Sequence, residues 1–504
     1  MFVSGVASMG LEILAGRIVA PEFGSSIYTW GSVIGVFLAA LSLGYHHGGR
    51  RATNASRGRL VGVLALATVF VALFVAVSDA VISASIALPL PMRLLPLAPV
   101  AVLFGPPTYL LGYVSPYAAE LSDTEGVGEA SGQVYAVGTV GSIVGAFGTT
   151  FLLVPALGVA PIGVLFGLLL VATAVGLSLS NPDRPPAVAA VLVAVVLVGA
   201  LTSGAVGVSA AGQVVYESET PYQQLRVTDL GDTRTLYLDG QRHSAMDLNE
   251  PTRHVFTYTR YFHLPYLFVE DPDQIDRVLF VGGGGFSGPK RFVEEYDARV
   301  DVVELDPAVI DVAKRYFGVE ESAQLRVYQG DGRRFLRNTD AEYDLIVMDA
   351  YRKDKVPFHL TTVEFARLAH DRLSADGVLF ANVIAAPSGP ASAFYRAQYR
   401  TLRQVFPQVY GFPTVGSSFV QNVEVVATKN DSRVSEATLR ERNRRRAIGI
   451  DLSAEIADYQ GSVRTDDVPV LRDDRAPVDR LLEPAVGQRY VVEQTNGSTA
   501  TPTA

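Results

Sequence analysis

The stretch Val278-Leu-Phe-Val-Gly-Gly-Gly-Gly-Phe-Ser-Gly288 decides the fold of the C-terminal part of this 504-residue chain. In it an apolar strand runs directly into a glycine-rich turn, and Gly283, Gly285 and Gly288 have the spacing G-x-G-x-x-G. Glycines allow a tight turn and a close approach of the backbone to a ligand, and the helix that follows offers free N–H groups. The stretch therefore predicts the first strand–turn–helix unit of a Rossmann-like α/β domain.

Strands and helices continue to alternate after this unit. The predicted strands are Val278–Val281, Val300–Glu304, Leu325–Tyr328, Leu345–Met348 and Val378–Val383, and the predicted helices lie near Pro289–Tyr296, Ala308–Phe317, Arg333–Asn338 and Val363–Leu373. Such alternation is typical of a mostly parallel sheet with helices on both faces. Ligands of these sheets bind beyond the carboxyl ends of the strands, so the residues that end each strand are the candidates for a binding site.

Short strands with alternating apolar and polar residues precede the α/β domain. They cover Val214–Tyr216, Gln224–Asp229 and Thr235–Asp239, and they predict a small antiparallel β unit. A charged helix is expected at Val434–Ala447, followed by loops. The Thr/Ser/Gly/Pro-rich end of the chain, Asn496–Ala504, is typical of a disordered tail.

The N-terminal part has a different composition. Up to Gly207 the chain has 7 Lys+Arg and 8 Asp+Glu, which leaves 35 and 43 for the remainder. A membrane-spanning helix needs about 20 mostly apolar residues. Seven stretches are candidates: Phe2–Ala20, Ile27–Tyr45, Leu60–Ile82, Leu95–Val114, Val134–Val154, Ile162–Leu179 and Ala187–Val206. We therefore expect a polytopic transmembrane helical domain at 1–207, the β unit at 213–265, the α/β domain at 266–485 and a disordered tail at 486–504.

The membrane topology leaves two alternatives. The loop His46–Arg59 contains four arginines, so the positive-inside rule makes it cytoplasmic. Counting seven spans from this loop puts the water-soluble part outside the cell. Either the number of spans is even or the domain is external, and the cofactor argument below favours a cytoplasmic domain on a multi-pass cell-membrane protein.

Composition excludes several classes of function. A net charge of −9 argues against a nucleic-acid partner, because phosphate binding needs clustered Lys and Arg. The chain has no cysteine, which excludes thiol catalysis and disulfides. His243, His254 and His359 do not have the spacing of a metal-ligand set, so no metal is expected.

Three acids end successive strands and predict one binding crevice. Glu304 ends the second strand about 20 residues after the glycine turn, where an acid can bind a ribose diol. Asp331, followed by Gly332, comes after the third strand, where a carboxylate can accept the exocyclic amine of adenine. Asp349 ends the very apolar strand Leu345–Met348. No Gly-Lys-Ser/Thr follows the glycines and no basic residue is placed for a 2′-phosphate, so an S-adenosyl compound fits better than NAD(P).

These residues belong to a wider set of motifs. The set includes Tyr222-Gln223, Leu238-Asp239-Gly240, the glycine turn, Val303-Glu304-Leu305-Asp306, Gly330-Asp331-Gly332 and Asp349. It resembles the spermidine/spermine synthases, the polyamine aminopropyltransferases, over about Val215 to Asn382. Further motifs, among them Gly132-Gln-Val-Tyr-Ala136, Pro357-Phe-His-Leu-Thr-Thr362 and Asp473-Asp-Arg-Ala-Pro-Val478, are similar to a membrane-fused branch of that family.

The resemblance implies a reaction and a role for each residue. The reaction is transfer of an aminopropyl group from decarboxylated S-adenosylmethionine to a small amine such as putrescine. Asp349 is then the catalytic base, Glu304 the ribose ligand and Asp331 the adenine ligand. The remaining assignments are these: Gln223, Gly283, Gly285 and Gly332 on the cofactor side, and Tyr222, His254 and Asp354 on the substrate side. The expected partners are this amine and the lipid bilayer, and the resemblance leaves a homodimer open.

The chain also departs from the family pattern on the amine side. Gly285 stands where the soluble synthases have an aspartate in the glycine turn, and Arg352 stands where a second acid follows the base. The adenosine side is intact. Two alternatives therefore stay open: a methyltransferase that uses S-adenosylmethionine itself, and a membrane transporter or sensor whose domain binds adenosyl ligands or polyamines without turnover.

Overall fold

The computed structural model describes residues 1–504 except for 24–26, 87, 89, 91, 123–125, 180–211, 351–355, 486, 487, 489 and 496–504. The chain divides into two compact units. The first comprises Met1–Ser209 and Ser218–Gln223, and the second comprises Ala210–Glu217 and Gln224–Ala504. Each unit is described separately below.

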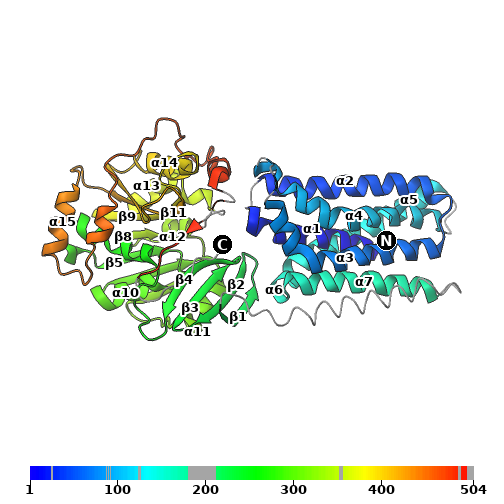
Figure 1. The fold of residues 1–504 in the computed structure, drawn as a ribbon, viewed down its shortest axis with the longest axis horizontal. Helices are drawn as coiled ribbons and strands as arrows, with labels where there is room; N and C mark the ends of the chain where they lie inside the picture. The colour runs from blue at the N-terminus through cyan, green and yellow to red at the C-terminus, as the bar shows by residue number, and fades with distance from the viewer. Residues whose placement is uncertain are drawn as a thin grey trace. The chain divides into compact units, whose positions relative to one another are not determined.

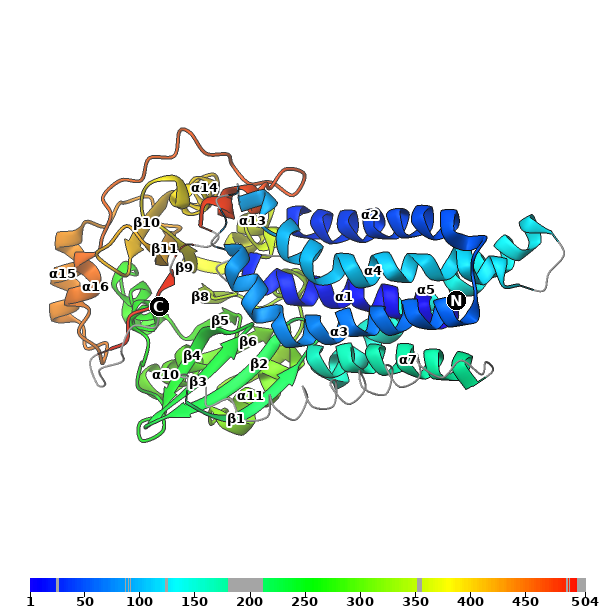
Figure 2. The same cartoon turned by 45° about the vertical axis from the view of Figure 1, so that its right-hand side comes forward.

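The first unit is helical. Its elements are α1 (Phe2–Phe23), α2 (Ile27–Ala52), α3 (Arg57–Ile86), η1 (Met92–Leu94), α4 (Leu97–Glu120), α5 (Val127–Gly148), the π-helical turn η2 (Thr149–Leu153), α6 (Val154–Ala156) and α7 (Val159–Leu179). Both ribbon views show α1, α2, α3, α4 and α7 running side by side (Figures 1 and 2). By length and composition, six helices among the described residues are candidates to cross a membrane. The predicted stretch Ala187–Val206 lies outside the described residues.

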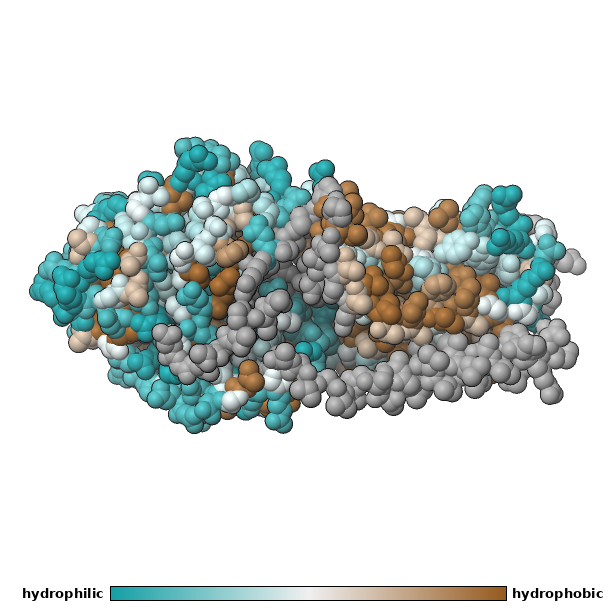
Figure 3. All heavy atoms as spheres, viewed as in Figure 1, coloured by the Kyte–Doolittle hydropathy of each residue, from teal (hydrophilic) through white to brown (hydrophobic). Residues whose placement is uncertain are grey.

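Glycines let the helices of this unit approach closely. A Cβ on Gly141 of α5 would lie 2.2 Å from the carbonyl oxygen of Phe2 in α1, and one on Gly44 of α2 would lie 2.3 Å from that of Tyr109 in α4. Small residues at such contacts are typical of helices that pack in lipid, where van der Waals contact drives association. Large apolar side chains face outward instead, including Leu38 (63% exposed) and Leu152 (70%). The space-filling view shows hydrophobic residues over these helices (Figure 3).

The second unit begins with a four-stranded antiparallel sheet in the order β1-β2-β3-β4. Its strands are β1 (Gln213–Glu219), β2 (Gln224–Leu230), β3 (Thr233–Leu238) and β4 (Gln241–Asp247). The predicted antiparallel unit is thus confirmed, with a fourth strand beyond the three expected. The pairing of β3 with β4 contains a β-bulge: Leu236 pairs with Ser244 and Tyr237 with Arg242, which leaves His243 without an opposite residue.

The larger sheet has the order β10-β11-β9-β8-β5-β6-β7, with β12 beside β11. Its strands are β5 (Arg277–Val281), β6 (Arg299–Glu304), β7 (Leu325–Gln329), β8 (Tyr343–Met348), β9 (Leu373–Ala385), β10 (Gln408–Pro413), β11 (Val420–Thr428) and β12 (Tyr490–Val491). Neighbours from β7 to β9 are parallel, whereas β11 is antiparallel to both β9 and β10. This is the mostly parallel, Rossmann-like sheet that the sequence predicts, and its strand order is that of the methyltransferase type. From β5 the chain continues outward through β6 and β7 on one side, and it then returns to place β8 and β9 on the other side of β5. Ligands of such sheets bind at the point between β5 and β8 where the strand order changes direction.

Two hydrophobic cores hold the sheet between helices. Residues of β5 alternate between them: Val278 and Phe280 belong to one core, and Leu279 and Val281 to the other. The longer helices are α10 (Ser287–Tyr296), α11 (Pro307–Tyr316), α12 (Gly332–Asn338), α13 (Val363–Arg372), α14 (Ala393–Leu402) and α15 (Glu436–Arg445). Shorter elements complete the unit: η3 (Thr257–His263), α9 (Pro265–Phe268), η4 (Pro272–Gln274), η5 (Phe358–Leu360), η6 (Pro390–Ser392), α16 (Ser453–Ala457), α17 (Val478–Leu482) and η7 (Glu483–Ala485).

Candidate functional site

The glycine turn after β5 is built by backbone geometry that few residues adopt. Gly282 (φ 98°) and Gly284 (φ 50°) lie in the left-handed region, and a Cβ on Gly282 would lie 2.4 Å from the carbonyl oxygen of Asp349. Phe286 also has a positive φ of 57° and is fully buried, so core packing holds its backbone there. The N–H of Gly285 donates to the hydroxyl of Ser244 at 2.9 Å. A Cβ at Gly285 would lie 2.8 Å from the Cβ of Ser244, so β4 leaves no room for the aspartate of the soluble synthases.

Glu304 ends β6 beside this turn. Its Oε2 accepts the N–H of Gly283 at 2.9 Å, and its Oε1 accepts the N–H of Asp306 at 2.9 Å. Burial raises the pKa of Glu304, and these two backbone N–H groups offset only part of that rise. Each carboxylate oxygen can accept one more hydrogen bond, so the side chain of Glu304 is suited to accept hydrogen bonds from the two hydroxyl groups of a ribose.

Asp331 follows β7 and begins α12 as its N-cap. Its Oδ1 accepts the N–H of Arg334 at 2.8 Å, and its Oδ2 lies 2.7 Å from Nε2 of His359. Burial alone would raise the pKa of Asp331, but the hydrogen bonds from Arg334 and His359 outweigh it, and the net direction is downward. An adenine amine bound here would therefore share a carboxylate that already has two partners. Gly332 is required next to it, because a Cβ there would lie 2.3 Å from Cγ1 of Val281.

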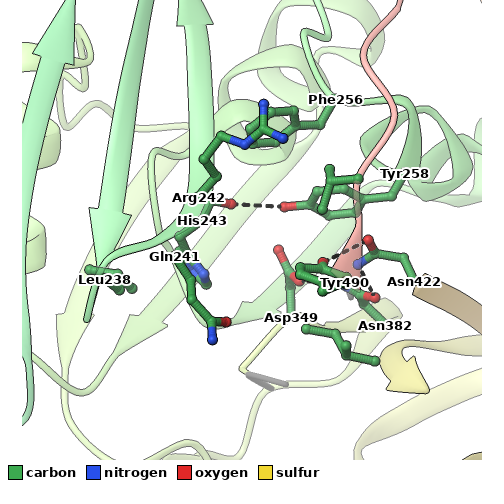
Figure 4. A pocket seen from close by; sticks show the side chains of 12 residues that line it. Leu238, Gln241, Arg242, His243, Phe256, Tyr258, Asp349, Asn382, Asn422 and Tyr490 are labelled. Carbon is green, nitrogen blue, oxygen red and sulfur yellow. Dashed lines mark hydrogen bonds between the residues drawn. The ribbon is translucent and has the colours of Figure 1, made fainter. Parts of the chain in front are cut away.

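Asp349 follows β8 and lines a cavity with residues from both sheets. The lining is Leu238, Gln241, Arg242, His243, Phe256, Tyr258, Asp349, Asn382, Ile384, Asn422, Tyr490 and Val492 (Figure 4). The Oδ1 of Asp349 accepts the side-chain amide of Asn382 at 2.8 Å. Burial raises the pKa of Asp349 to about 7, with the amide of Asn382 opposing and nearby Glu304 adding to the rise. A base needs a pKa near the working pH, and this carboxyl has one.

Asn382, Asn422 and Tyr490 form a chain of hydrogen bonds that ends on Asp349. None of the three residues was predicted from the sequence. The Oδ1 of Asn382 accepts the amide of Asn422 at 2.8 Å, and the Oδ1 of Asn422 accepts the hydroxyl of Tyr490 at 2.8 Å. These residues come from β9, β11 and β12, so this network crosses three strands (Figure 4). Asn382 interrupts the apolar run Val378–Ile384, and Asn422 is one of the polar residues in the buried strand β11, which is the signal that could have found them.

Glu424 of β11 was also missed. Its side chain is fully buried, and neither carboxyl oxygen has a hydrogen-bond partner among the described residues. It pairs in register with Asn382, the residue that binds Asp349. Burial, with the charge of Asp349 adding, raises the pKa of Glu424 well above its usual value. Burial of Glu424 without a hydrogen-bond donor among the described residues therefore favours its protonated form.

The predicted residues Tyr222, Gln223 and His254 are not among the described residues that line the cavity beside Asp349. His254 is buried with its Nε2 2.7 Å from Nε2 of His263, and burial lowers its pKa to about 3. Tyr222 is 44% exposed and Gln223 is buried, and both belong to the first compact unit. Asp354 lies outside the described residues. Within the described part of the chain, no cluster of three or more His, Asp or Glu side chains could hold a metal ion.

The sheet order and the glycine turn define a Rossmann-like α/β protein, and its three strand-end acids follow the carboxyl ends of β6, β7 and β8. A family model described as Spermine/spermidine synthase domain matches residues 256–430. A polyamine aminopropyltransferase of Vibrio vulnificus is 33% identical over 208 residues, covering 40% of this chain and 67% of that protein. The chain belongs to the spermine/spermidine synthase family.

Other relatives extend the comparison. A probable polyamine aminopropyl transferase of Bifidobacterium longum is 26% identical over 296 residues, covering 55% of this chain and 64% of that protein. A relative from Streptococcus uberis is matched over 57% of its own length, so the chain spans only about three fifths of some relatives. Among solved structures, a spermidine synthase in complex with the transition-state analogue AdoDATO has a TM-score of 0.40 and 20% identity, covering 50% of this chain and 85% of that one.

Proposed function

We propose that this chain is a membrane-bound aminopropyltransferase that uses decarboxylated S-adenosylmethionine as donor and a small amine such as putrescine as acceptor. Glu304 binds the ribose, Asp331 takes part in adenine binding, and Asp349 is the base. The relatives named above, which carry the aminopropyltransferase name, support the donor and the reaction class.

The chemistry needs one proton acceptor in a fixed position. The acceptor amine is an alkylammonium in water and has no lone pair until it loses a proton. Asp349 takes that proton; the nitrogen then attacks the carbon next to the sulfonium, and the carbon–sulfur bond breaks. The electron pair of that bond goes to sulfur, which leaves as neutral methylthioadenosine. Holding donor and acceptor in line supplies much of the remaining rate.

One observation carries this proposal: the carboxyl of Asp349 lines a cavity at the carboxyl edge of the sheet with a pKa of about 7. An ordinary surface aspartate would be too weak a base to accept a proton from an ammonium. Its hydrogen bond from Asn382 also fixes one oxygen and leaves the other free of partners among the described residues. The second oxygen is the one that faces the amine.

The test is turnover by the full chain in detergent or liposomes. Decarboxylated S-adenosylmethionine and putrescine should give methylthioadenosine and an aminopropylated amine. Asp349→Asn should abolish product, whereas Asp340→Asn, in an exposed loop before β8, should not change it. Formation of S-adenosylhomocysteine from ordinary S-adenosylmethionine would instead support a methyltransferase, and binding without product would support a sensor.

We also propose that the catalytic domain lies on the cytoplasmic side of the cell membrane. The loop between α2 and α3 is flanked by Arg50, Arg51, Arg57 and Arg59, which the positive-inside rule makes cytoplasmic. Among the described residues four candidate spans follow that loop, an even number, which favours the same side for the catalytic domain. The predicted stretch Ala187–Val206 lies outside the described residues and would add one crossing, so the proposed side rests on the cofactor, an S-adenosyl compound, as well as on this count. The chain has no cysteine, so Asn54→Cys and Asp340→Cys can each be labelled alone in intact cells. Neither should react with an impermeant maleimide, and labelling of Asp340→Cys only would place the domain outside.

A further inference from the structure

The β-bulge in β4 gives the cavity an unusual wall. In a regular strand successive side chains point to opposite faces, so three consecutive residues do not line one space. Here Gln241, Arg242 and His243 all line the cavity that contains Asp349. The bulge at His243 breaks the alternation, and bulges commonly re-aim side chains next to functional sites.

Arg242 is a charged group in this wall for which the described residues provide no counter-ion. The structure shows no carboxylate in an ion pair with it and no hydrogen bond from its guanidinium, as far as residues are described. Its charge acts on Tyr490, whose pKa it lowers against the dominant effect of burial. The side chain is only partly exposed. A guanidinium held in a cavity wall without an acid is available to bind a carboxylate or a phosphate in bidentate geometry.

Asp349 lines the same cavity and has no cationic partner among the described residues; its partner is the neutral amide of Asn382. Figure 4 shows Arg242 extending from β4 beside Phe256, while Asp349 lies on the other side of the hydrogen bond from Tyr258 to the carbonyl oxygen of His243. The cavity therefore presents one positive and one negative group that do not neutralise each other. Electrostatic complementarity to such a wall requires a ligand with both charges.

We propose that this cavity takes a zwitterionic ligand, in which an anionic group contacts Arg242 while an ammonium or sulfonium lies toward Asp349. The inference rests on the proposed function for the role of Asp349, and it replaces one of the two ligands named there, putrescine or the decarboxylated donor, by its carboxylated counterpart. Two sources of the anion are compatible with the chemistry. It is a carboxylate on the acceptor amine, or it is the α-carboxylate that ordinary S-adenosylmethionine retains and the decarboxylated donor lacks.

Matched ligand pairs separate these sources. Ornithine differs from putrescine by one carboxylate, and S-adenosylmethionine differs from its decarboxylated form by one carboxylate. Binding of all four to the full chain is measured by calorimetry in detergent, and turnover is measured for each donor with each acceptor. We expect the carboxylated member of one pair to bind about 10- to 100-fold more tightly, because a hydrogen bond to a charged group contributes about 1.5–3 kcal/mol.

Variants of Arg242 show whether this preference arises from its guanidinium. Arg242→Gln should remove the preference for the carboxylated ligand and leave binding of the uncarboxylated one within about twofold. Arg242→Lys should keep part of the preference, because it keeps the charge but loses the planar fork. Arg326→Gln, an exposed arginine of β7, is the matched control and should change neither ligand. If Arg242→Gln does not fold, the comparison between wild type and Arg242→Lys answers the same question.

The outcomes distinguish the two proposals. Absence of any product, together with a carboxylate preference that Arg242→Gln removes, would overturn the aminopropyltransferase assignment and keep the zwitterionic site. Product formation with equal or tighter binding of putrescine and the decarboxylated donor would keep the enzyme and overturn the role of Arg242. A preference for carboxylated ligands that survives in Arg242→Gln would also overturn it.

Discussion

Replacing Asp349 by Asn should stabilise the α/β domain at neutral pH while it removes turnover. Asn has the same shape as Asp and can still accept the amide of Asn382, so packing and the 2.8 Å hydrogen bond are preserved. What changes is the charge. The folded domain raises the pKa of Asp349 from 3.8 to about 7, so the folded protein keeps a proton that the unfolded chain releases. Stability from this group is therefore fully present below about pH 4 and is lost as the pH rises toward 7.

The magnitude follows from this shift. A difference of about three pH units between folded and unfolded pKa values corresponds to about 4 kcal/mol at pH 8, because each unit is worth about 1.4 kcal/mol. At pH 5 the same group costs only about 1.7 kcal/mol. The wild type should thus lose up to about 2.5 kcal/mol relative to Asp349→Asn between pH 5 and pH 8. Since Asp349 keeps part of its surface open to the cavity, this figure is an upper limit.

The assay is urea unfolding of the full chain in detergent, followed by pulse proteolysis of the α/β domain at pH 5, 6, 7 and 8. Asp349→Asn should have the higher urea midpoint at pH 8, and the two midpoints should approach each other at pH 5. Asp340→Asn lies in an exposed loop and should follow the wild type throughout. Midpoints of wild type and Asp349→Asn that differ by a constant amount from pH 5 to pH 8 would refute the raised pKa and, with it, the assignment of Asp349 as the base.

Three further predictions follow from the same contacts. The value of kcat/KM should rise about tenfold per pH unit below pH 7 and level off above it, since only ionised Asp349 accepts the proton; a rate independent of pH from 5 to 8 would contradict this. Glu424→Gln should raise the urea midpoint at pH 8 and leave it unchanged at pH 4. The reason is that the buried carboxyl of Glu424 holds its proton in the folded state and loses it on unfolding at pH 8. An equal effect at both pH values would show a packing change instead. Gly285→Ala should cost about 1–3 kcal/mol of unfolding free energy through its contact with Ser244, and the double variant with Ser244→Gly should recover most of that loss.

The strand-end acids could be predicted from the sequence because a parallel sheet brings the carboxyl ends of its strands to one edge. Glu304 follows β6 and Asp349 follows β8, the two strands that flank β5, and the charge of Glu304 adds to the rise in the pKa of Asp349. The supporting residues could not be predicted in this way. Asn382 and Asn422 are 40 residues apart, and they meet only because β9 and β11 pair in one particular antiparallel register. The pairing register of two strands cannot be predicted from a single sequence in this case, because neither strand has a pattern that specifies which residues lie opposite each other.

The partner of Asp331 shows the same limit. The sequence predicts the acid, and the structure adds His359 at 2.7 Å, which approaches from a 3₁₀ turn 28 residues further along the chain. The sequence also does not explain why position 285 is a glycine. The explanation is the close approach of Ser244, in the small sheet, to the glycine turn. In both cases the decisive contact joins segments whose separation in sequence carries no pattern.

The proposed function gives three carboxylates different roles, and the different hydrogen-bond donors that each one receives support this division. Glu304 is held by two backbone N–H groups, and Asp331 by one backbone N–H and a histidine, so both are fixed as acceptors for further hydrogen bonds. Asp349 receives a single neutral amide among the described residues, from Asn382, and its charge adds to the rise in the pKa of the buried Glu424, which pairs in register with Asn382. Environments that push the pKa values of like groups apart assign the acid–base role among them. By this criterion Asp349 is the acid that can exchange a proton near pH 7, and a cation arriving beside it is what would favour its ionised form.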